Sequence, residues 1–130
     1  MNAPGEVTTR PATVYVVDDE PLLLELAVII LKPVGCEVQT FRDPEAALKQ
    51  FATHLPDLVI TDYAMGRMNG MDLIRECRRL KPHQKTLLVS GTVDEHVFAD
   101  GIIKPDRFLT KPYQFRDFLN CVRELLSVEQ

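Results

Sequence analysis

The sequence predicts an α/β fold in which a doubly wound parallel sheet carries helices on both faces. Two observations lead to this prediction. Short runs of β-branched and aromatic residues lack polar alternation, as expected of strands covered on both faces. These runs alternate with segments whose apolar residues recur every three or four positions, as they do in helices. With 130 residues, the chain has the size of one domain and can bury a substantial core.

The first strand is predicted over Val14–Val17, and a helix over Pro21–Lys32 follows it. Pro21 suits the first turn of a helix, where the N–H that proline lacks is not needed. Pro33 and Gly35 lie just beyond the last turn, and this pair typically ends a helix. The segment therefore has a start signal and a stop signal on either side of its apolar run.

The second strand is predicted over Cys36–Phe41, and a second helix begins at Pro44. Asp43 is expected to cap this helix, because a side-chain oxygen at that position accepts a free backbone N–H. Glu45 adds negative charge near the positive end of the helix dipole. The third strand is predicted over Leu58–Thr61, an apolar run that ends in an aspartate.

A loop over Tyr63–Gly70 leads into a third helix that runs to about Leu80, where Pro82 stops it. The fourth strand is predicted over Thr86–Val89. The apolar positions of the third helix recur at helical spacing and are Leu73, Ile74, Cys77 and Leu80.

Residues 93–106 are expected to form only a short or irregular fourth helix, because Gly101 and Pro105 interrupt them. The fifth strand is predicted over Arg107–Thr110. The last helix then presents one apolar stripe, which consists of Phe115, Phe118, Leu119, Val122, Leu125 and Leu126.

Five alternating strand and helix units with right-handed crossovers predict a flavodoxin-like (βα)5 sheet with strand order 2-1-3-4-5. In this order the first and third strands are neighbours, and their carboxyl ends line one crevice. Asp18 and Asp19 follow the first strand, and Asp62 follows the third. Ser90 and Lys111 follow the fourth and fifth strands. We therefore expect these five side chains to converge.

These residue types suit a magnesium ion and a transferable phosphoryl group. Mg²⁺ prefers oxygen ligands and commonly uses one or two carboxylates together with phosphate oxygens. Asp19 and Asp62 suit direct ligation, and Asp18 could bind directly or through water. Three nearby carboxylates require either raised pKa values or a bound cation. Asp62 could then attack phosphorus as a nucleophile, while Lys111 neutralises the transferring charge.

Each of these signals also has a purely structural interpretation. The acidic run at 18–20 could only cap a helix, and Ser90 before a glycine could be a turn residue. A second Lys-Pro pair occurs at Lys104, although only Lys111 follows a predicted strand. The joint occurrence of the signals in this order is what predicts a site.

In order, spacing and flanking residues, the chain resembles the response-regulator receiver domain of bacterial two-component signalling from about Thr13 to Val128. The motifs that carry the resemblance are Val-Val-Asp-Asp-Glu at 16–20, Asp-Tyr-Ala-Met at 62–65, Met-Asn-Gly at 68–70, Ser-Gly at 90–91 and Phe-Leu-Thr-Lys-Pro at 108–112. The resemblance implies that Asp62 is the phosphoacceptor. It also implies Mg²⁺ (or Mn²⁺) bound by Asp18, Asp19, Asp62 and the backbone carbonyl of Ala64.

The same resemblance implies roles for the later motifs. Ser90 would hydrogen-bond one phosphoryl oxygen and Lys111 would pair with another. Phe108 occupies the position of an aromatic that turns inward on phosphorylation, although a phenylalanine at this position taken alone is more often plain core. The bond before Pro112 would be cis. Phosphorylation would then bias a two-state packing of the faces near the last two helices.

Three departures from the family pattern affect the expected interactions. Gly66 stands where the family often has proline, so we expect a more mobile loop there. The interruption at Gly101 and Pro105 puts the usual dimer face in doubt. The helix over Pro21–Lys32 is apolar nearly all round. This surface could pack on the sheet and the last helix, or it could dock a kinase, a phosphotransfer protein or a second copy in a homodimer.

Composition restricts the other function classes. The net charge of -4 argues against direct nucleic-acid binding, which normally needs clustered basic residues. The basic cluster that contains Arg75, Arg78 and Arg79 is expected to lie at a helix end, where it complements the dipole. Three separated cysteines suggest neither disulfides nor zinc. We expect a cytoplasmic protein without a signal peptide or membrane insertion.

The predicted organisation is a flexible tail over residues 1–12 and a receiver domain over 13–130. We expect it to accept a phosphoryl group from a histidine kinase or histidine phosphotransfer protein and so to switch partner interactions. It would not be an enzyme with a separate substrate, although it would catalyse its own phosphorylation and dephosphorylation. The sequence given shows no output domain after the last helix, so we expect that the protein either acts by binding partners or is a piece of a longer chain, and the downstream partner is undetermined. The alternatives are a pseudo-receiver interaction module and a small aspartate-nucleophile phosphatase.

Overall fold

The computed structural model describes residues 10–91, 101 and 103–127 and confirms the predicted α/β fold. Its parallel strands form one sheet in the order β2-β1-β3-β4-β5, as the sequence predicted. The strands are β1 (Thr13–Val17), β2 (Glu37–Phe41), β3 (Leu58–Asp62), β4 (Lys85–Ser90) and β5 (Arg107–Thr110).

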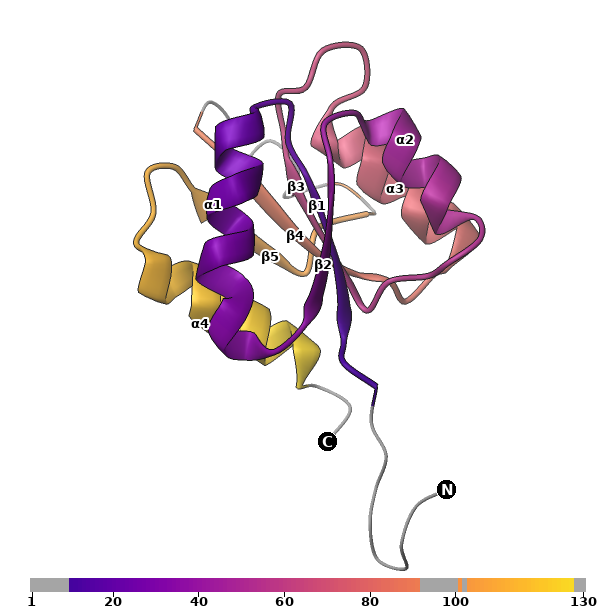
Figure 1. Cartoon of the computed structure of the whole chain (residues 1–130). Helices are drawn as coiled ribbons and strands as arrows, with labels where there is room; N and C mark the ends of the chain where they lie inside the picture. Colours follow the sequence, from indigo (N-terminus) through magenta and orange to yellow (C-terminus); the bar gives the residue numbers. More distant parts are fainter. Residues whose placement is uncertain (1–9, 92–100, 102, 128–130) are drawn as a thin grey trace, which may run out of the picture.

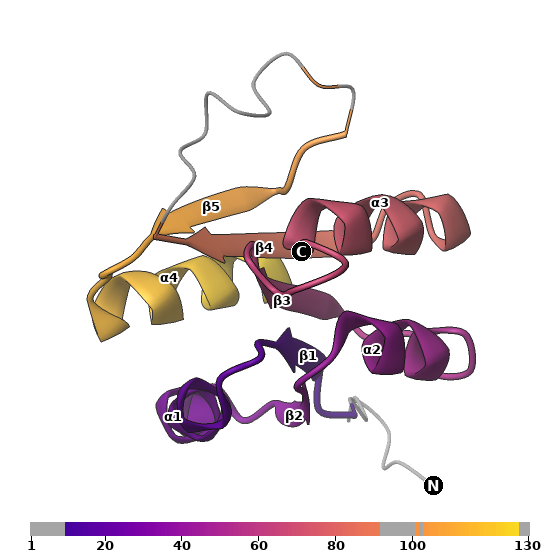
Figure 2. The ribbon, with the colours of Figure 1, turned by 90° about the horizontal axis from the view of Figure 1, so that it is seen from above.

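Helices cover both faces of this sheet. Figures 1 and 2 show α1 and α4 on one side and α2 and α3 on the other. The helices are α1 (Pro21–Leu31), α2 (Pro44–Phe51), α3 (Gly70–Leu80) and α4 (Phe115–Leu126). The short helix expected within 93–106 falls largely on residues 92–100 and 102, which lie outside the described residues. The same holds for residues 1–9 of the expected tail.

Local sequence signals account for most helix ends. Asp43 accepts the backbone N–H of Glu45 at 3.1 Å and so caps α2. Asn69 and Asp72 form a reciprocal capping box at the start of α3. The helix expected to end at Lys32 ends one residue earlier and continues as a 3₁₀ turn over Lys32–Val34. The reason is that Pro33 has no N–H to continue the α-helical ladder.

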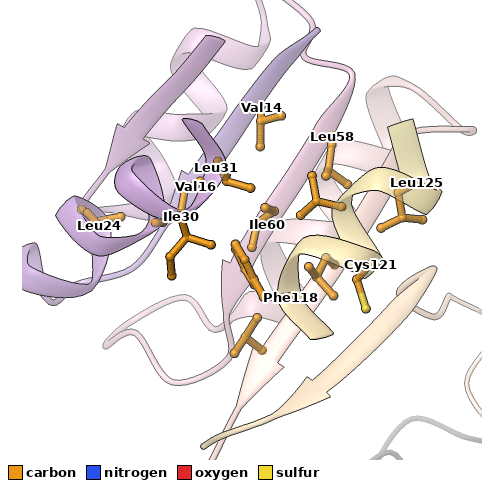
Figure 3. Close-up of a cluster of buried hydrophobic side chains, with 14 residues drawn as sticks. Val14, Val16, Leu24, Ile30, Leu31, Leu58, Ile60, Phe118, Cys121 and Leu125 are labelled. Carbon is orange, nitrogen blue, oxygen red and sulfur yellow. The ribbon is translucent and has the colours of Figure 1, made fainter. Parts of the chain in front are cut away.

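Two apolar clusters join the helices to the sheet. Figure 3 shows the cluster between the sheet and the pair α1 and α4, where Phe118 lies among residues of the strands. The cluster on the opposite face contains Tyr15 and Phe51 and packs α2 and α3 against the sheet. Because both faces are covered, the residues of β1 from Val14 to Val17 are all buried, as their apolar run predicted.

The α1 helix does not bury all of its apolar residues. Its inward side is formed by Leu24, Ala27, Ile30 and Leu31. On its outer side, Leu22 is 75% exposed and Ile29 is 65% exposed. These two residues are seven positions apart and therefore lie along one line of the helix. We call Leu22 and Ile29 the outer α1 surface. No helix within the described residues has the length and apolar character that a membrane span needs.

Candidate functional site

Three aspartates meet at the carboxyl ends of β1 and β3. These strands are paired, with Val17 opposite Thr61, and the loops that follow them lie at the same end of the sheet (Figure 1). One carboxylate oxygen from each of Asp18, Asp19 and Asp62 lies within 4.8 Å of the others. The topology thus brings together the three carboxylates that the sequence predicted to converge.

The three carboxylates differ in their surroundings. Asp18 is buried, Asp62 is partly buried and Asp19 is exposed. The Asp18 Oδ1 atom accepts the backbone N–H of Glu20 at 3.0 Å. Burial raises the pKa of Asp18, although this hydrogen bond and Lys111 act in the opposite direction. Glu20 itself is the N-cap of α1 and makes no side-chain cap bond. Side-chain capping of α1 therefore does not explain the acidic residues at 18–20, which the sequence alone left as a possible helix cap.

Lys111, the residue after β5, completes the cluster. Its Nζ atom lies 3.2 Å from Asp62 Oδ1 and 3.8 Å from Asp18 Oδ2. Burial favours the neutral amine, but the two carboxylates outweigh it, so the pKa of Lys111 is raised. The ammonium group therefore keeps its charge. The peptide bond between Lys111 and Pro112 is cis.

Ser90 and Phe108 lie on the neighbouring strands β4 and β5. Ser90 is the last residue of β4 and is buried. Its backbone oxygen accepts the N–H of Lys111 at 2.9 Å, which links the ends of β4 and β5. Phe108 lies in β5 and packs with Met71 and Leu88 in a third cluster, on the side that faces α3. The structure thus places Ser90 at the carboxyl end of β4, the strand that pairs with β3, and Phe108 between the sheet and α3.

The loop after β3 holds Asp62 against the start of α3. The backbone N–H of Gly70 donates to Tyr63 at 2.8 Å. A Cβ atom added at Gly70 would lie only 2.3 Å from the Asp62 carbonyl oxygen, so any side chain would clash there. Ala64, the expected carbonyl ligand, is exposed in this loop. Gly66 has a φ of 75°, a left-handed conformation that proline cannot adopt.

Two residues near the site were not predicted from the sequence. Gly70 was predicted only as a loop residue and as part of the Met-Asn-Gly motif, because a clash with Asp62 can be recognised only after α3 is placed. Tyr113 lines a small cavity together with Asp18, Asp62 and Lys111. Its position two residues after Lys111 could have indicated that Tyr113 lies near the site. An aromatic residue at that position is equally compatible with a place in the hydrophobic core.

The cluster has the composition of a divalent cation site. Its oxygen atoms are close enough to share one ion, and oxygen ligands are those that Mg²⁺ prefers. Three carboxylates and one ammonium group leave a net negative charge. A bound cation would relieve the remaining repulsion. The residues present therefore fit Mg²⁺.

A family model described as the response regulator receiver domain matches residues 14–123. Among curated relatives, the probable transcriptional regulatory protein TcrX of Mycobacterium tuberculosis is 30% identical over 119 residues, which cover 90% of this chain and 50% of TcrX. Protein PilG of Pseudomonas aeruginosa is 28% identical over 113 residues, covering 85% of this chain and 84% of PilG. The chain spans about half the length of TcrX and of other transcriptional regulators that it matches.

Solved structures agree with this match. The response regulator protein TrrA from Thermotoga maritima, in complex with Mg(2+)-BeF, has a TM-score of 0.78 and 31% identity, covering 88% of this chain and 99% of that one. A CheY-like receiver domain protein from Methanospirillum hungatei has a TM-score of 0.84 at 24% identity, covering 92% of this chain and 97% of that one. The similarity to the Methanospirillum hungatei protein shows that the two chains share a fold.

Proposed function

The chain belongs to the response regulator receiver domain family, and on that premise we propose that it accepts a phosphoryl group on Asp62 in a Mg²⁺-dependent reaction. The observation that carries the proposal is the ion pair between Lys111 and Asp62, at 3.2 Å, beside two further carboxylates at the same sheet edge. The donor is the phosphohistidine of a histidine kinase or a histidine phosphotransfer protein. The modification switches the interactions of the domain with its partners.

The transfer is a nucleophilic displacement at phosphorus. A carboxylate oxygen of Asp62 forms a bond to phosphorus while the bond between phosphorus and the donor imidazole nitrogen breaks. The leaving nitrogen keeps the electron pair and takes up a proton. Lys111 pairs with one phosphoryl oxygen, and the Ser90 hydroxyl donates to another. Water later hydrolyses the acyl phosphate, so the domain catalyses its own phosphorylation and slow dephosphorylation.

Asp18, Asp19, Asp62 and the carbonyl oxygen of Ala64 would hold the metal ion. A bound Mg²⁺ would neutralise negative charge on the phosphoryl group. The TrrA structure supports this assignment, since that protein was solved with Mg(2+)-BeF and is 31% identical to this chain. The buried position of Asp18 and the hydrogen bond from Glu20 fix the direction of one carboxylate before any ion arrives.

We assign the response to the region around β4 and β5. Ser90 lies at the end of β4, and Phe108 packs in the cluster between β5 and α3. A phosphoryl group that draws Ser90 toward Asp62 would change the space available to Phe108 on the neighbouring strand. Phosphorylation would thereby bias two packing arrangements of this face.

The outer α1 surface is the proposed contact for the histidine-bearing partner. Leu22 lies one residue after the start of α1, four positions beyond Asp18, and so is close to the site. An apolar surface beside a reactive carboxylate can hold a protein donor while transfer occurs. Of the other functions considered, a pseudo-receiver and a phosphatase are favoured by no geometric feature of the described residues, in which Asp18, Asp62 and Lys111 lie together.

Intact mass after incubation with acetyl phosphate tests the proposal. We expect one added phosphoryl group that requires Mg²⁺ and is lost in Asp62→Ala. The matched control is Asp57→Asn, which removes a partly buried aspartate that pairs with Arg10 and lies before β3 rather than after it. This variant should be modified like the native chain. Absence of any addition, or addition that persists in Asp62→Ala, would contradict the proposal.

A further inference from the structure

Tyr113 is held rigidly beside the carboxylate cluster. Its ring stacks on that of Phe118, with centroids 5.3 Å apart and an angle of 15° between the planes. Phe118 is 2% exposed and belongs to the cluster between α1, α4 and the sheet, where Figure 3 shows it. Because Phe118 is fixed by the core, the stacked ring of Tyr113 has little freedom to move.

The same ring borders the charged side chains. Tyr113, Phe118, Asp18, Asp62 and Lys111 line one cavity of about 30 Å³, together with apolar residues of α1 and the central strands. This volume is enough for a water molecule but not for a larger ligand. The cavity therefore separates the charged groups from the core, with Tyr113 as one wall.

The charged groups that line this cavity affect the pKa of the Tyr113 phenol. Burial raises the pKa of Tyr113, Lys111 lowers it, and Asp18 and Asp62 raise it further. Tyr113 in turn contributes to the raised pKa of Lys111. The phenol thus stays protonated and lies within the electrostatic reach of the ammonium group.

We propose that Tyr113 is a positioning residue for phosphoryl transfer, whose ring forms the wall that keeps the Lys111 ammonium group directed at Asp62. This inference rests on the proposed function. A lysine side chain has many rotamers, and its charge is strongly hydrated in water. A rigid aromatic wall removes both rotamers and water on one side of Lys111. The ammonium group is then already in place when the transferring charge develops.

Three variants distinguish the effect of the Tyr113 ring from the effects of its hydroxyl group and of general packing. Tyr113→Leu keeps an apolar side chain but removes the stack, whereas Tyr113→Phe keeps the stack and removes only the hydroxyl. Phe115→Leu is the matched control, because it also replaces an aromatic at the start of α4. Phe115 is 52% exposed and is not among the described residues that line the cavity.

Rates of phosphorylation by acetyl phosphate are measured at saturating Mg²⁺, and the Mg²⁺ dissociation constant is measured separately. We expect Tyr113→Leu to lower the rate about tenfold with an unchanged dissociation constant, because the metal ligands are untouched. Tyr113→Phe and Phe115→Leu should stay within about twofold of the native rate. A native rate in Tyr113→Leu, or an equal loss in Tyr113→Phe, would overturn the role of the ring.

A double-mutant cycle with Lys111→Met tests whether the effect passes through Lys111. If it does, Tyr113→Leu should have almost no further effect in the Lys111→Met background. The same tenfold loss in both backgrounds would show that Tyr113 acts independently, which contradicts the inference. If the native chain itself is never phosphorylated, the proposed function fails. If it is phosphorylated and Tyr113→Leu is normal, only this inference fails.

Discussion

Arg78, near the end of α3, and Asp106, the residue before β5, form an ion pair in which Nη2 and Oδ2 are 2.9 Å apart. Other N–H groups of Arg78 donate to the carbonyl oxygens of Gln84, at 3.0 Å, and Lys104, at 2.7 Å. Asp106 Oδ2 also accepts the backbone N–H of Thr86 at 2.7 Å. One guanidinium group thus joins α3, the start of β4 and the segment that leads into β5.

Removal of this guanidinium should weaken the fold. The Arg78 side chain is only 16% exposed, and Arg78→Ala removes its partly buried hydrogen bonds to the Gln84 carbonyl oxygen and Thr86 Oγ1 as well as the ion pair. We expect the free energy of unfolding in urea to fall by about 2–3 kcal/mol. Arg78→Lys should recover less than half of this loss, because an ammonium group cannot reach all of the acceptors.

The neighbouring arginine provides the control for this experiment. Arg79 is 66% exposed and pairs with Glu76, which is itself 41% exposed. Arg79→Ala should change the unfolding free energy by less than about 0.5 kcal/mol. Equal losses in Arg78→Ala and Arg79→Ala would mean that the Arg78 interactions contribute no more than a surface pair.

Gly70→Ala should displace the end of β3, which carries Asp62. The added Cβ would lie 2.3 Å from the Asp62 carbonyl oxygen and 2.8 Å from Leu88 Cδ1, so the backbone must shift. We expect a loss of about 2–3 kcal/mol in the unfolding free energy, as in overpacked cores. For Gly91→Ala the nearest atom is Lys111 Cβ at 3.4 Å, and the loss should be below about 1 kcal/mol. Similar losses in the two variants would refute the steric account.

Lys111→Met should change metal binding and phosphorylation in opposite directions. Loss of the ammonium group 3.2 Å from Asp62 leaves more negative charge on the carboxylates, so Mg²⁺ affinity should rise about threefold or more. The phosphorylation rate should fall about tenfold or more, because charge on the phosphoryl group is no longer neutralised. Mg²⁺ titration and intact mass measure the two quantities.

An exposed lysine remote from the site provides the control for Lys111→Met. Lys49 lies on α2 and is exposed, so Lys49→Met should leave both Mg²⁺ affinity and phosphorylation rate unchanged. Weaker Mg²⁺ binding in Lys111→Met would show that Lys111 orders the carboxylates rather than competing with the ion.

Charged substitutions on the outer α1 surface should distinguish binding of the histidine-bearing partner from the phosphorylation reaction itself. Leu22→Asp and Ile29→Asp should slow phosphotransfer from a phosphorylated histidine-bearing partner about tenfold, because each places a charge in an apolar contact. Phosphorylation by acetyl phosphate should not change. Leu55, which is 52% exposed and precedes β3, provides the matched control Leu55→Asp. Unchanged phosphotransfer and an unchanged oligomeric state in both α1 variants would refute the assignment.

Much of the fold follows from local patterns in the sequence. Each predicted strand boundary lies within one residue of the observed one, because an apolar run ends where the strand leaves the covered sheet. The convergence of Asp18 and Asp62 was also predictable. Right-handed crossovers between parallel strands bring the carboxyl ends together whatever the sequence of the helices.

Contacts between distant helices and strands were harder to predict from the sequence. The basic residues around Arg78 were expected only to complement a helix dipole, since Asp106 lies 28 positions further along the chain. The exposure of Ile29 could not be distinguished from burial on α1, whose residues are apolar nearly all round. The need for glycine at position 70 depends on how closely α3 approaches β3.

Local sequence patterns were enough to give the order of the elements and the chemistry available at the carboxyl ends of the strands, because backbone hydrogen bonding and apolar periodicity act over a few residues. Tertiary structure alone decided which side chains support that chemistry. The wall that Tyr113 forms with Phe118 and the tie between Arg78 and Asp106 both depend on packing between distant segments. Such packing is set by the shape and volume of whole elements, which no local pattern encodes.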